Sequence, residues 1–325
     1  MKRNNFAIAD FFSGIGGMRL AFEQAGFQTV YAIDNDPTCC HVYKENFCVY
    51  PLGDVIGLDL EEIPDFDVFV AGFPCQPFSL AGRKLGLKDE RGKVVYEIFN
   101  VLKKKRPKAF LLENVKHFFK HDQGRTFALM KNVLKKEYNI YSKIINAKDF
   151  GLPQNRERLY IVGLRKDVFE NTDFEFPRAK KLKLSVKDIL ENNVSADHYL
   201  SRRLLSTLQK HKKRHKKKGN GFGMIILNPH SCANTLLRGN MGRERNLVID
   251  TTSFTKLNEE DIKNKNRKYV RYLTPREYAR LQGFSDSFKI PIPKTAAYKL
   301  LGNSVPVPVV KRIAEKIMLL LRDNS

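Results

Sequence analysis

Residues 67–79 read Asp-Val-Phe-Val-Ala-Gly-Phe-Pro-Cys-Gln-Pro-Phe-Ser, and this stretch decides the fold of the chain. Its first five residues form a short apolar run, ended by Gly72, that is typical of a buried strand. Pro74 and Pro77 cannot continue a central strand, so the chain leaves the sheet there. Cys75 therefore lies on a stiff loop at the carboxyl end of a strand, the edge of an open α/β sheet where ligands bind. This pattern indicates a cysteine nucleophile beside a cofactor crevice.

Strand-like and helix-like segments alternate over the first 165 residues. Such alternation predicts βαβ units, and hence an α/β fold with a mostly parallel sheet and helices on both faces. The expected strands are 7–12, 29–33, 67–71, 109–112, 140–146 and 159–163, and the expected helices between the first of them are 17–24 and 37–46.

The character of the sequence changes at about residue 180. Residues 202–218 are crowded with Arg, Lys and His, and an irregular stretch with several glycines follows. This composition indicates a second, smaller and loop-rich domain. Helical patterns then resume, because Thr274 and Glu277 form a capping box, Gly283 ends that helix, and 306–321 reads as a final amphipathic helix.

The charge balance points to a polyanionic partner. The chain has 325 residues, with 58 Lys and Arg against 35 Asp and Glu, and a formal net charge of +23. Such an excess favours nucleic acid, with an anionic membrane surface as the alternative. No run approaches the roughly 18 apolar residues of a membrane span and no secretory signal is present, so we expect a cytoplasmic location and no membrane. Five cysteines without paired zinc spacing predict reduced thiols and no metal site.

A glycine-rich turn follows the first expected strand. Residues 12–17 read Phe-Ser-Gly-Ile-Gly-Gly, which suits backbone approach to a cofactor or, alternatively, a tight turn without a ligand. Asp34 ends the second strand at a spacing that suits ribose hydroxyls; the alternative is a helix cap, the role we expect for Asp36. Gly53-Asp54-Val55 supplies a third contact. Because no full dinucleotide fingerprint and no Gly-Lys-Ser/Thr loop occur, a nucleoside cofactor without phosphates fits best, and S-adenosylmethionine is the common one.

Charged groups also follow two later strands. Glu113 comes directly after an apolar run, so it is either a functional carboxylate or a cap for the next helix. Residues 154–158 read Gln-Asn-Arg-Glu-Arg, and Arg156 and Arg158 project to one side if this segment is extended. The two guanidinium groups then face an anionic or carbonyl-bearing substrate, or they form a solvated strand entrance.

Six motifs in one order resemble the motif series of DNA (cytosine-5)-methyltransferases, most closely the compact bacterial restriction–modification type. They are Phe-Ser-Gly-Ile-Gly-Gly (12–17), Gly-Phe-Pro-Cys-Gln-Pro-Phe-Ser (72–79), Glu-Asn-Val (113–115), Gln-Asn-Arg-Glu-Arg (154–158), Arg-Glu-Tyr-Ala-Arg-Leu-Gln-Gly-Phe (276–284) and Gly-Asn-Ser-Val-Pro (302–306). The resemblance covers 6–178 and 270–322 and implies the Rossmann-like fold of S-adenosylmethionine-dependent methyltransferases. It implies a catalytic domain at 1–178, a target-recognition domain at 179–269, and a return to the catalytic domain at 270–325.

The resemblance also implies the chemistry. Cys75 would be the nucleophile that adds to carbon 6 of cytosine, and Glu113 would hydrogen-bond or protonate ring nitrogen 3. Arg158 would hold the carbonyl oxygen of the base, and Arg156 would support the site. The target cytosine would be flipped out of the duplex, and the segment 80–92 would close over the DNA.

The implied cofactor is S-adenosylmethionine, with S-adenosylhomocysteine as the product and no metal. Phe12 would stack on adenine, Asp34 stands where a glutamate is usual and would bind the ribose, and Asp54 would accept the adenine amino group. Asn35 stands where this type has a bulky tryptophan, so one wall of the adenine pocket lacks its usual side chain. The implied cofactor-binding residues are Phe12, Ser13, Gly14, Gly16, Gly17, Asp34, Asn35, Asp54, Val55, Pro74, Asn303 and Ser304.

The implied partner is double-stranded DNA, bound by a monomer, with a cognate restriction endonuclease as a genetic rather than physical partner. Thr235-Leu236 resembles the family's pair that opens the recognition loops. The basic run 210–218 is either a phosphate-binding surface or a solvated linker. The expected DNA-binding residues are Gln76, Ser79, Arg83, Lys84, Arg91, Lys212, Lys213, Thr235, Arg238, Arg243 and Arg245.

Two rival functions share part of this pattern. An RNA cytosine-5 methyltransferase of the kind that modifies tRNA has the same Pro-Cys and Glu-Asn-Val motifs, but that branch usually shows a Cys-Phe-Thr segment, which this sequence lacks. The other rival is a basic DNA-binding protein whose catalytic residues are relics. Intact Cys75, Glu113 and Arg158 argue against it.

Overall fold

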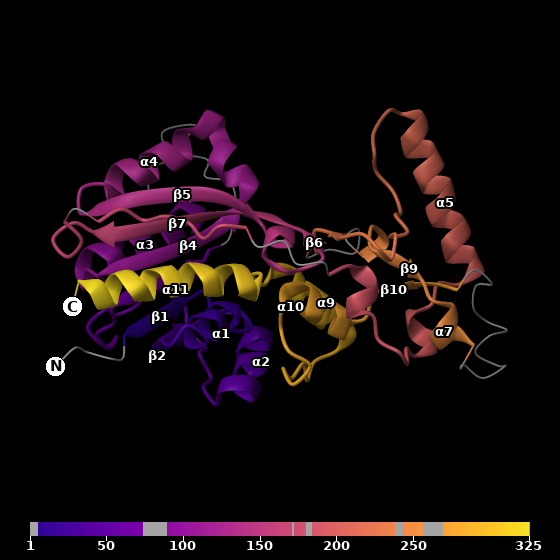
Figure 1. The fold of residues 1–325 in the computed structure, drawn as a ribbon, viewed down its shortest axis with the longest axis horizontal. Coiled ribbons are helices and arrows are strands. Elements are labelled where there is room, and N and C mark those ends of the chain that lie inside the picture. The colour runs from indigo at the N-terminus through magenta and orange to yellow at the C-terminus, as the bar shows by residue number, and fades with distance from the viewer. Residues whose placement is uncertain are drawn as a thin grey trace. The chain divides into compact units, whose positions relative to one another are not determined.

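A computed structural model describes residues 6–73, 90–170, 172–179, 184–237, 243–255 and 269–324, with the backbone alone for 90–93. The chain divides into two compact units (Figure 1). Unit 1 comprises residues 1–146, 157–179 and 305–325, and unit 2 comprises 147–156 and 180–304. In the described part of the chain, no helix is long and apolar enough to cross a membrane.

Unit 1 is built on a six-stranded sheet in the order β2-β1-β3-β4-β7-β5. Its first four strands pair in parallel, and β7 runs antiparallel to its neighbours β4 and β5. This sheet confirms the expected α/β fold. The strands are β1 (Ala7–Phe11), β2 (Gln28–Ile33), β3 (Val68–Gly72), β4 (Ala109–Val115), β5 (Tyr138–Asn146) and β7 (Glu157–Arg165).

Helices cover the sheet of unit 1. Alternate strand residues, among them Phe69, Phe110 and Ile161, join the buried sides of α3 and α4 in one hydrophobic cluster. Outside that cluster α1 packs against β1, β3 and α11, and Figure 1 shows α11 running along the sheet, in line with its strands. The helices are α1 (Gly17–Glu23), α2 (Pro37–Phe47), α3 (Glu90–Lys105), α4 (Arg125–Leu134) and α11 (Val307–Asp323), with the 3₁₀ helix η1 (Lys116–Gly124) before α4.

Unit 2 is made of short elements and loops. Its small core combines Leu205 and Leu208 of α5 with Leu247 of β9 and Val270 of β10. The helices are α5 (Arg202–Lys217), α7 (Thr251–Phe254), α9 (Pro275–Gln282) and α10 (Lys294–Asn303), with 3₁₀ helices η2 (Ala147–Phe150), η3 (Val186–Ile189) and η4 (Ala196–His198). The strand pairs are β9 (Leu247–Ile249) with β10 (Val270–Tyr272) and β6 (Gln154–Asn155) with β8 (Ala233–Asn234).

The capping box is present as expected. The Glu277 N–H donates to Thr274 Oγ1 at 3.1 Å, and Glu277 Oε2 accepts from the Thr274 N–H at 2.7 Å. Gly283 ends α9 at φ 85, a left-handed conformation that suits glycine. The basic run, for which a linker was one expectation, instead continues α5, because Leu205 and Leu208 anchor that helix to the core of unit 2.

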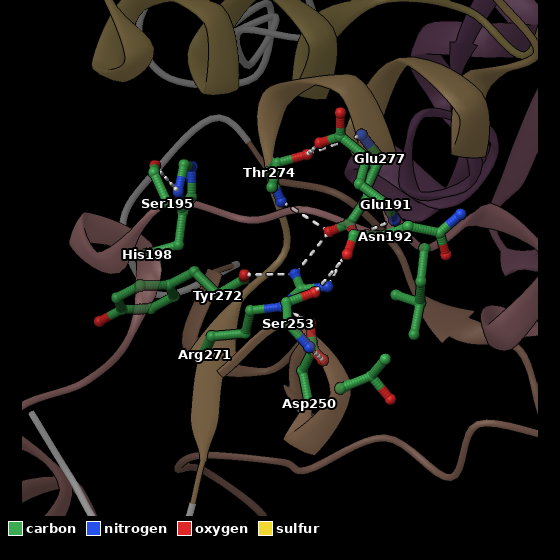
Figure 2. A network of polar contacts seen from close by, with 12 residues as sticks. Glu191, Asn192, Ser195, His198, Asp250, Ser253, Arg271, Tyr272, Thr274 and Glu277 are labelled. Carbon is green, nitrogen blue, oxygen red and sulfur yellow. Dashed lines mark hydrogen bonds and ion pairs between the residues drawn. The ribbon is translucent and has the colours of Figure 1, made fainter. Parts of the chain in front are cut away.

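The division into units differs from the expected domain boundaries. Residues 147–156 and 270–304 belong to unit 2, and only 305–325 returns to unit 1. A buried network explains part of this difference (Figure 2): Arg271 of β10 bonds Glu277 of α9 through both carboxylate oxygens at 2.8 Å and Asp250 Oδ2 at 2.7 Å. Glu277 also accepts from the Glu191 N–H at 2.9 Å. These contacts make α9 and β10 part of unit 2.

Candidate active site

Glu113 and Arg158 meet at the edge of the sheet where the parallel strands end. Glu113 of β4 lies opposite Gly72, the last residue of β3, and Arg158, the second residue of the reversed strand β7, lies opposite Val115. Arg158 Nε is 3.1 Å from Glu113 Oε1, and the two side chains are 12% and 10% exposed. In so shielded a position the ion pair fixes the direction of both side chains. The alternative role of Glu113 as a helix cap is not seen over 109–124, because η1 begins after Val115 without a side-chain cap.

The backbone beside this ion pair leads directly to Cys75. A Cβ atom added to Gly72 would lie 3.8 Å from Glu113 Oε2, so the carboxylate borders the exit of β3. The side chain of buried Asn114 donates to the Phe73 carbonyl at 3.2 Å and fixes the chain direction there. Several expected site residues lie outside the described residues, namely Pro74, Cys75, Gln76, Ser79, Arg83, Lys84 and Arg238, and for Arg91 the backbone alone is described, in α3.

The glycine-rich loop after β1 has a strained, left-handed course. Phe12, Gly14 and Gly16 have φ values of 54, 55 and 86. Glycine is required at 16, because a Cβ atom there would come within 2.2 Å of the Phe47 ring. Phe12 is half-buried against the hydrophobic cluster, and its ring is the aromatic surface of this loop.

Asp34 ties the end of β2 to that loop. Its Oδ2 accepts from the Gly14 N–H at 2.8 Å and its Oδ1 from the Asp36 N–H at 2.9 Å. Burial raises the pKa of the Asp34 carboxyl, and these two donors oppose that effect. Each carboxylate oxygen has a second lone pair, which leaves capacity to accept from ribose hydroxyls. The helix-cap role belongs to Asp36, as expected, because its Oδ1 accepts from the Thr38 N–H at the start of α2.

The third cofactor segment lies beside the end of β2. Asp34 and Leu52 form a parallel bridge, and the Gly53 N–H donates to the Asp34 carbonyl at 3.0 Å. Asp54 is exposed, and its Oδ1 accepts from the Ile56 N–H at 2.9 Å. An aromatic ring and two carboxylates thus gather around the ends of β1 and β2, and this combination of a stacking surface with two acceptors fits a nucleoside. Asn35 is exposed and Val55 buried beside this set.

Arg156 and Arg158 were expected to project to one side of an extended segment. The structure does not show this arrangement. Strand β6 ends at Asn155 and β7 begins at Glu157, and the Arg156 N–H donates back to the Gln154 carbonyl at 3.0 Å, so the segment is not one extended strand. Arg156 is only 1% exposed and lies in unit 2. There it donates to the carbonyls of Leu236 at 3.0 Å, Gly302 at 3.1 Å and Ser304 at 2.7 Å. The contacts of the Arg156 guanidinium therefore fix the backbone of the 236 and 302–304 segments.

The other expected residues of unit 2 are spread over several elements. Lys212 and Lys213 are exposed on α5. The Thr235 hydroxyl donates to the Asn155 carbonyl at 2.6 Å, and the Arg243 guanidinium lies 5.0 Å from the centre of the Tyr298 ring. Arg245 is half-buried, and Asn303 ends α10, with Ser304 next to it.

The structure also contains two sets of buried polar residues that the sequence does not predict. Asp10, the penultimate residue of β1, is fully buried, and burial raises the pKa of its carboxyl to about 8, against the opposing effect of Arg19. The Arg271 network of unit 2 is also new, although the capping box had singled out Glu277 (Figure 2). Neither has a local signal, because the burial of a charged residue depends on elements that are distant in sequence.

Comparison with known proteins gives consistent matches along the chain. The family model of the C-5 cytosine-specific DNA methylases matches residues 6–319. The Type II methyltransferase M.HpaII of Haemophilus parainfluenzae is 44% identical over 97% of this chain and 90% of its own length. The Type II methyltransferase M.HhaI of Haemophilus parahaemolyticus is 36% identical over 95% of this chain and 93% of its own length.

Solved structures match the fold over nearly the whole chain. The S. pombe Dnmt2 methyltransferase has a TM-score of 0.74 and 25% identity, covering 98% of this chain and 99% of that one. The Entamoeba histolytica methyltransferase EhMeth has a TM-score of 0.76 and 22% identity, covering 99% of each chain.

Proposed function

We propose a mechanism from the premise that this chain belongs to the C-5 cytosine-specific DNA methylase family and is a cytosine-specific DNA methyltransferase of the Type II restriction–modification kind. In this proposal, the enzyme transfers a methyl group from S-adenosylmethionine to carbon 5 of a cytosine flipped out of a short specific duplex site. The reaction passes through a covalent adduct with Cys75. The observation that carries the proposal is the Glu113–Arg158 ion pair beside the backbone that leads to Cys75.

Nucleophilic addition comes first. Carbon 5 of cytosine is too weak a nucleophile to be methylated unaided. The Cys75 thiolate adds to carbon 6, and the electron pair of the 5,6 double bond moves toward carbon 5 and the ring amidine. Glu113 hydrogen-bonds or protonates ring nitrogen 3 and so offsets the developing charge. Arg158 holds the carbonyl oxygen and, through Nε, the carboxylate of Glu113, so one side chain positions both the base and its partner.

Methyl transfer and release follow. The chemistry that bound S-adenosylmethionine would supply is an electrophilic methyl group: a bond would form between that methyl carbon and carbon 5 while its bond to the sulfonium sulfur breaks, and S-adenosylhomocysteine would be the leaving group. A base, which we take to be water, then removes the hydrogen of carbon 5. The electron pair of that C–H bond re-forms the double bond and expels the Cys75 thiolate. The segment 80–92 is proposed to close over the DNA during these steps.

Unit 1 carries most of the proposed cofactor contacts. The Phe12 ring would stack on adenine, Asp34 would accept from the ribose hydroxyls, and Asp54 would accept from the adenine amino group. The arrangement of these three around the ends of β1 and β2 supports the assignment. The resemblance adds Asn303 and Ser304, which lie in unit 2.

The duplex is proposed to contact basic and polar groups of unit 2. Exposed Lys212 and Lys213 on α5 suit phosphates, since lysines are point charges on flexible stems. Thr235, Arg243 and Arg245 are proposed for base or phosphate contacts. We further propose that the enzyme acts as a monomer, in the cytoplasm, and that a cognate restriction endonuclease is its genetic partner.

Methyl transfer from labelled cofactor to duplex DNA and to tRNA tests this function. We expect transfer to duplex DNA, none to tRNA, and none to either with Cys75→Ser, because a hydroxyl is a far poorer nucleophile. Transfer to tRNA alone would establish the RNA methyltransferase instead. Cys75→Ser activity within tenfold of wild type would remove Cys75 from the mechanism.

A further inference from the structure

Three buried polar side chains of unit 2 join parts of the chain that are far apart in sequence. They are Gln154, Arg156 and Gln282, with exposures of 0%, 1% and 0%, and we call them the buried bracket. A buried polar group is destabilising unless its donors and acceptors are satisfied. The partners of the buried bracket therefore identify the segments that it holds.

Arg156 holds two of these segments at once. Its Nη1 donates to the Leu236 carbonyl at 3.0 Å, and its Nη2 donates to the carbonyls of Gly302 at 3.1 Å and Ser304 at 2.7 Å. The guanidinium is a rigid planar fork, so its donors point in fixed directions. Three carbonyls that accept from one fork are fixed relative to one another.

The two glutamines hold the same segments from other sides. Gln154 Oε1 accepts from the Leu236 N–H at 3.2 Å, and Gln154 Nε2 donates to the Leu281 carbonyl at 2.8 Å. Gln282 Nε2 donates to the Leu301 carbonyl at 2.8 Å and the Ser304 carbonyl at 3.2 Å. The N–H and the carbonyl of Leu236 are thus both bonded to the bracket. The Ser304 carbonyl accepts from both Arg156 and Gln282.

We infer that the buried bracket positions the target-recognition residues relative to the cofactor segment, and that Arg156 and Gln154 are its positioning residues. Leu236 directly follows Thr235, and Gly302 and Ser304 flank Asn303. The inference rests on the proposed function, because it uses the roles proposed there for Thr235 and Asn303. Contacts to base edges need exact placement, whereas contacts to phosphates are the same at every site. The bracket is therefore expected to control discrimination between DNA sites.

Methylation profiling of a bacterial host that lacks cytosine methylation tests the inference. Wild type, Arg156→Lys and Arg276→Lys are expressed at matched levels of folded protein, and bisulfite sequencing of the wild-type host defines the methylated site. The measured quantity is the methylation at that site divided by the methylation at sites that differ by one base pair. Lysine keeps the charge at 156, but a single ammonium cannot reach three carbonyls in the geometry of a fork.

Arg276 provides a matched control in the same unit. It also donates to two backbone carbonyls, those of Ser285 at 3.1 Å and Phe288 at 2.8 Å, but these lie in neither the Leu236 nor the Ser304 segment. We expect the ratio to fall about tenfold or more in Arg156→Lys, the equivalent of removing one well-formed buried hydrogen bond. It should stay within twofold of wild type in Arg276→Lys.

The outcomes separate the inference from the proposed function. If the host that expresses the wild-type protein gained no cytosine methylation, the proposed function would be refuted. Methylation by wild type with an unchanged ratio in folded Arg156→Lys would refute the inference, because a merely structural role lowers methylation at all sites alike. Should thermal melting show that Arg156→Lys does not fold, Gln154→Met replaces it. That variant lacks the acceptor for Leu236 and the donor to Leu281 at similar volume, and an unchanged ratio there would overturn the inference equally.

Discussion

Replacing Glu113 by glutamine is the sharpest single perturbation of the proposed chemistry. Glutamine keeps the shape of the side chain but removes its charge and its ability to protonate nitrogen 3. The contact between Arg158 Nε and Glu113 Oε1, at 3.1 Å, is an ion pair between side chains that are 12% and 10% exposed, and glutamine at 113 would leave the Arg158 guanidinium without its charged partner. A positioned general acid contributes about 10²–10⁴ in rate. We therefore expect the single-turnover rate constant of methyl transfer to fall by about 10²–10⁴ in Glu113→Gln.

Single-turnover methyl transfer to duplex DNA measures this effect, and Glu157→Gln is the matched control. Glu157 is the neighbouring carboxylate at the start of β7, exposed and paired with Lys116 Nζ at 2.8 Å, and an exposed pair contributes about 0–1 kcal/mol. The control should stay within about threefold of wild type, which is at most about 0.7 kcal/mol. A Glu113→Gln enzyme within tenfold of wild type, or an equal loss in both variants, would refute the role of Glu113.

Three further predictions test the cofactor site, the DNA surface and the buried carboxyl. Asp54→Ala should weaken S-adenosylmethionine binding in calorimetry by about 1–3 kcal/mol, because the adenine amino group no longer has its acceptor. Asp59→Ala, which removes a similar turn contact in which the Glu61 N–H donates to Asp59 Oδ1, should leave the affinity unchanged. Replacing Lys212, Lys213, Lys216 and Lys217 by glutamine should weaken binding to all duplexes alike and lower the log–log salt slope by up to about 0.9 for each phosphate that is no longer neutralised, without changing the preferred sequence. The same replacement at four exposed lysines of unit 1 should change neither the affinity for duplex DNA nor the salt slope; these are Lys120, Lys131, Lys135 and Lys136. An equal change in both variants would mean that α5 is only a solvated face. Asp10 has its pKa raised from 3.8 to about 8, so between those values the folded state holds a proton that the unfolded state has released. Its contribution to the free energy of unfolding therefore falls as pH rises through this window, by about 1.4 kcal/mol per pH unit. Denaturant unfolding at a series of pH values should show this fall in wild type and not in Asp10→Asn. Parallel profiles of the free energy of unfolding against pH would contradict the prediction.

Local sequence patterns were sufficient to predict most of unit 1. Strands of a parallel sheet are buried on both faces, so 67–71 and 109–112 appear as continuous apolar runs. The capping box at Thr274 and the cap at Asp36 are also local, since each contact joins residues within three positions of one another.

The contacts that depend on distant segments could not be predicted in the same way. Arg156 and Arg158 are two residues apart, yet they belong to different units, because the partners of Arg156 are near 236 and 302–304. The assignment of 270–304 to unit 2 likewise depends on bonds such as that from Gln154 to Leu281. The basic run 210–218 has no apolar residue, so its helix was not evident without the anchor at Leu205 and Leu208.

The covalent adduct of Cys75 is the most direct test of the proposed mechanism. A duplex that carries 5-fluorocytosine at the methylated position is incubated with enzyme and S-adenosylmethionine and then analysed on a denaturing gel. Fluorine cannot leave carbon 5 as a proton does, so the thiolate cannot be expelled. We predict a stable protein–DNA adduct with wild type, mapped to Cys75 by mass spectrometry, and none with Cys75→Ser. Methyl transfer to ordinary duplex DNA without any adduct on the fluorinated duplex would contradict the mechanism.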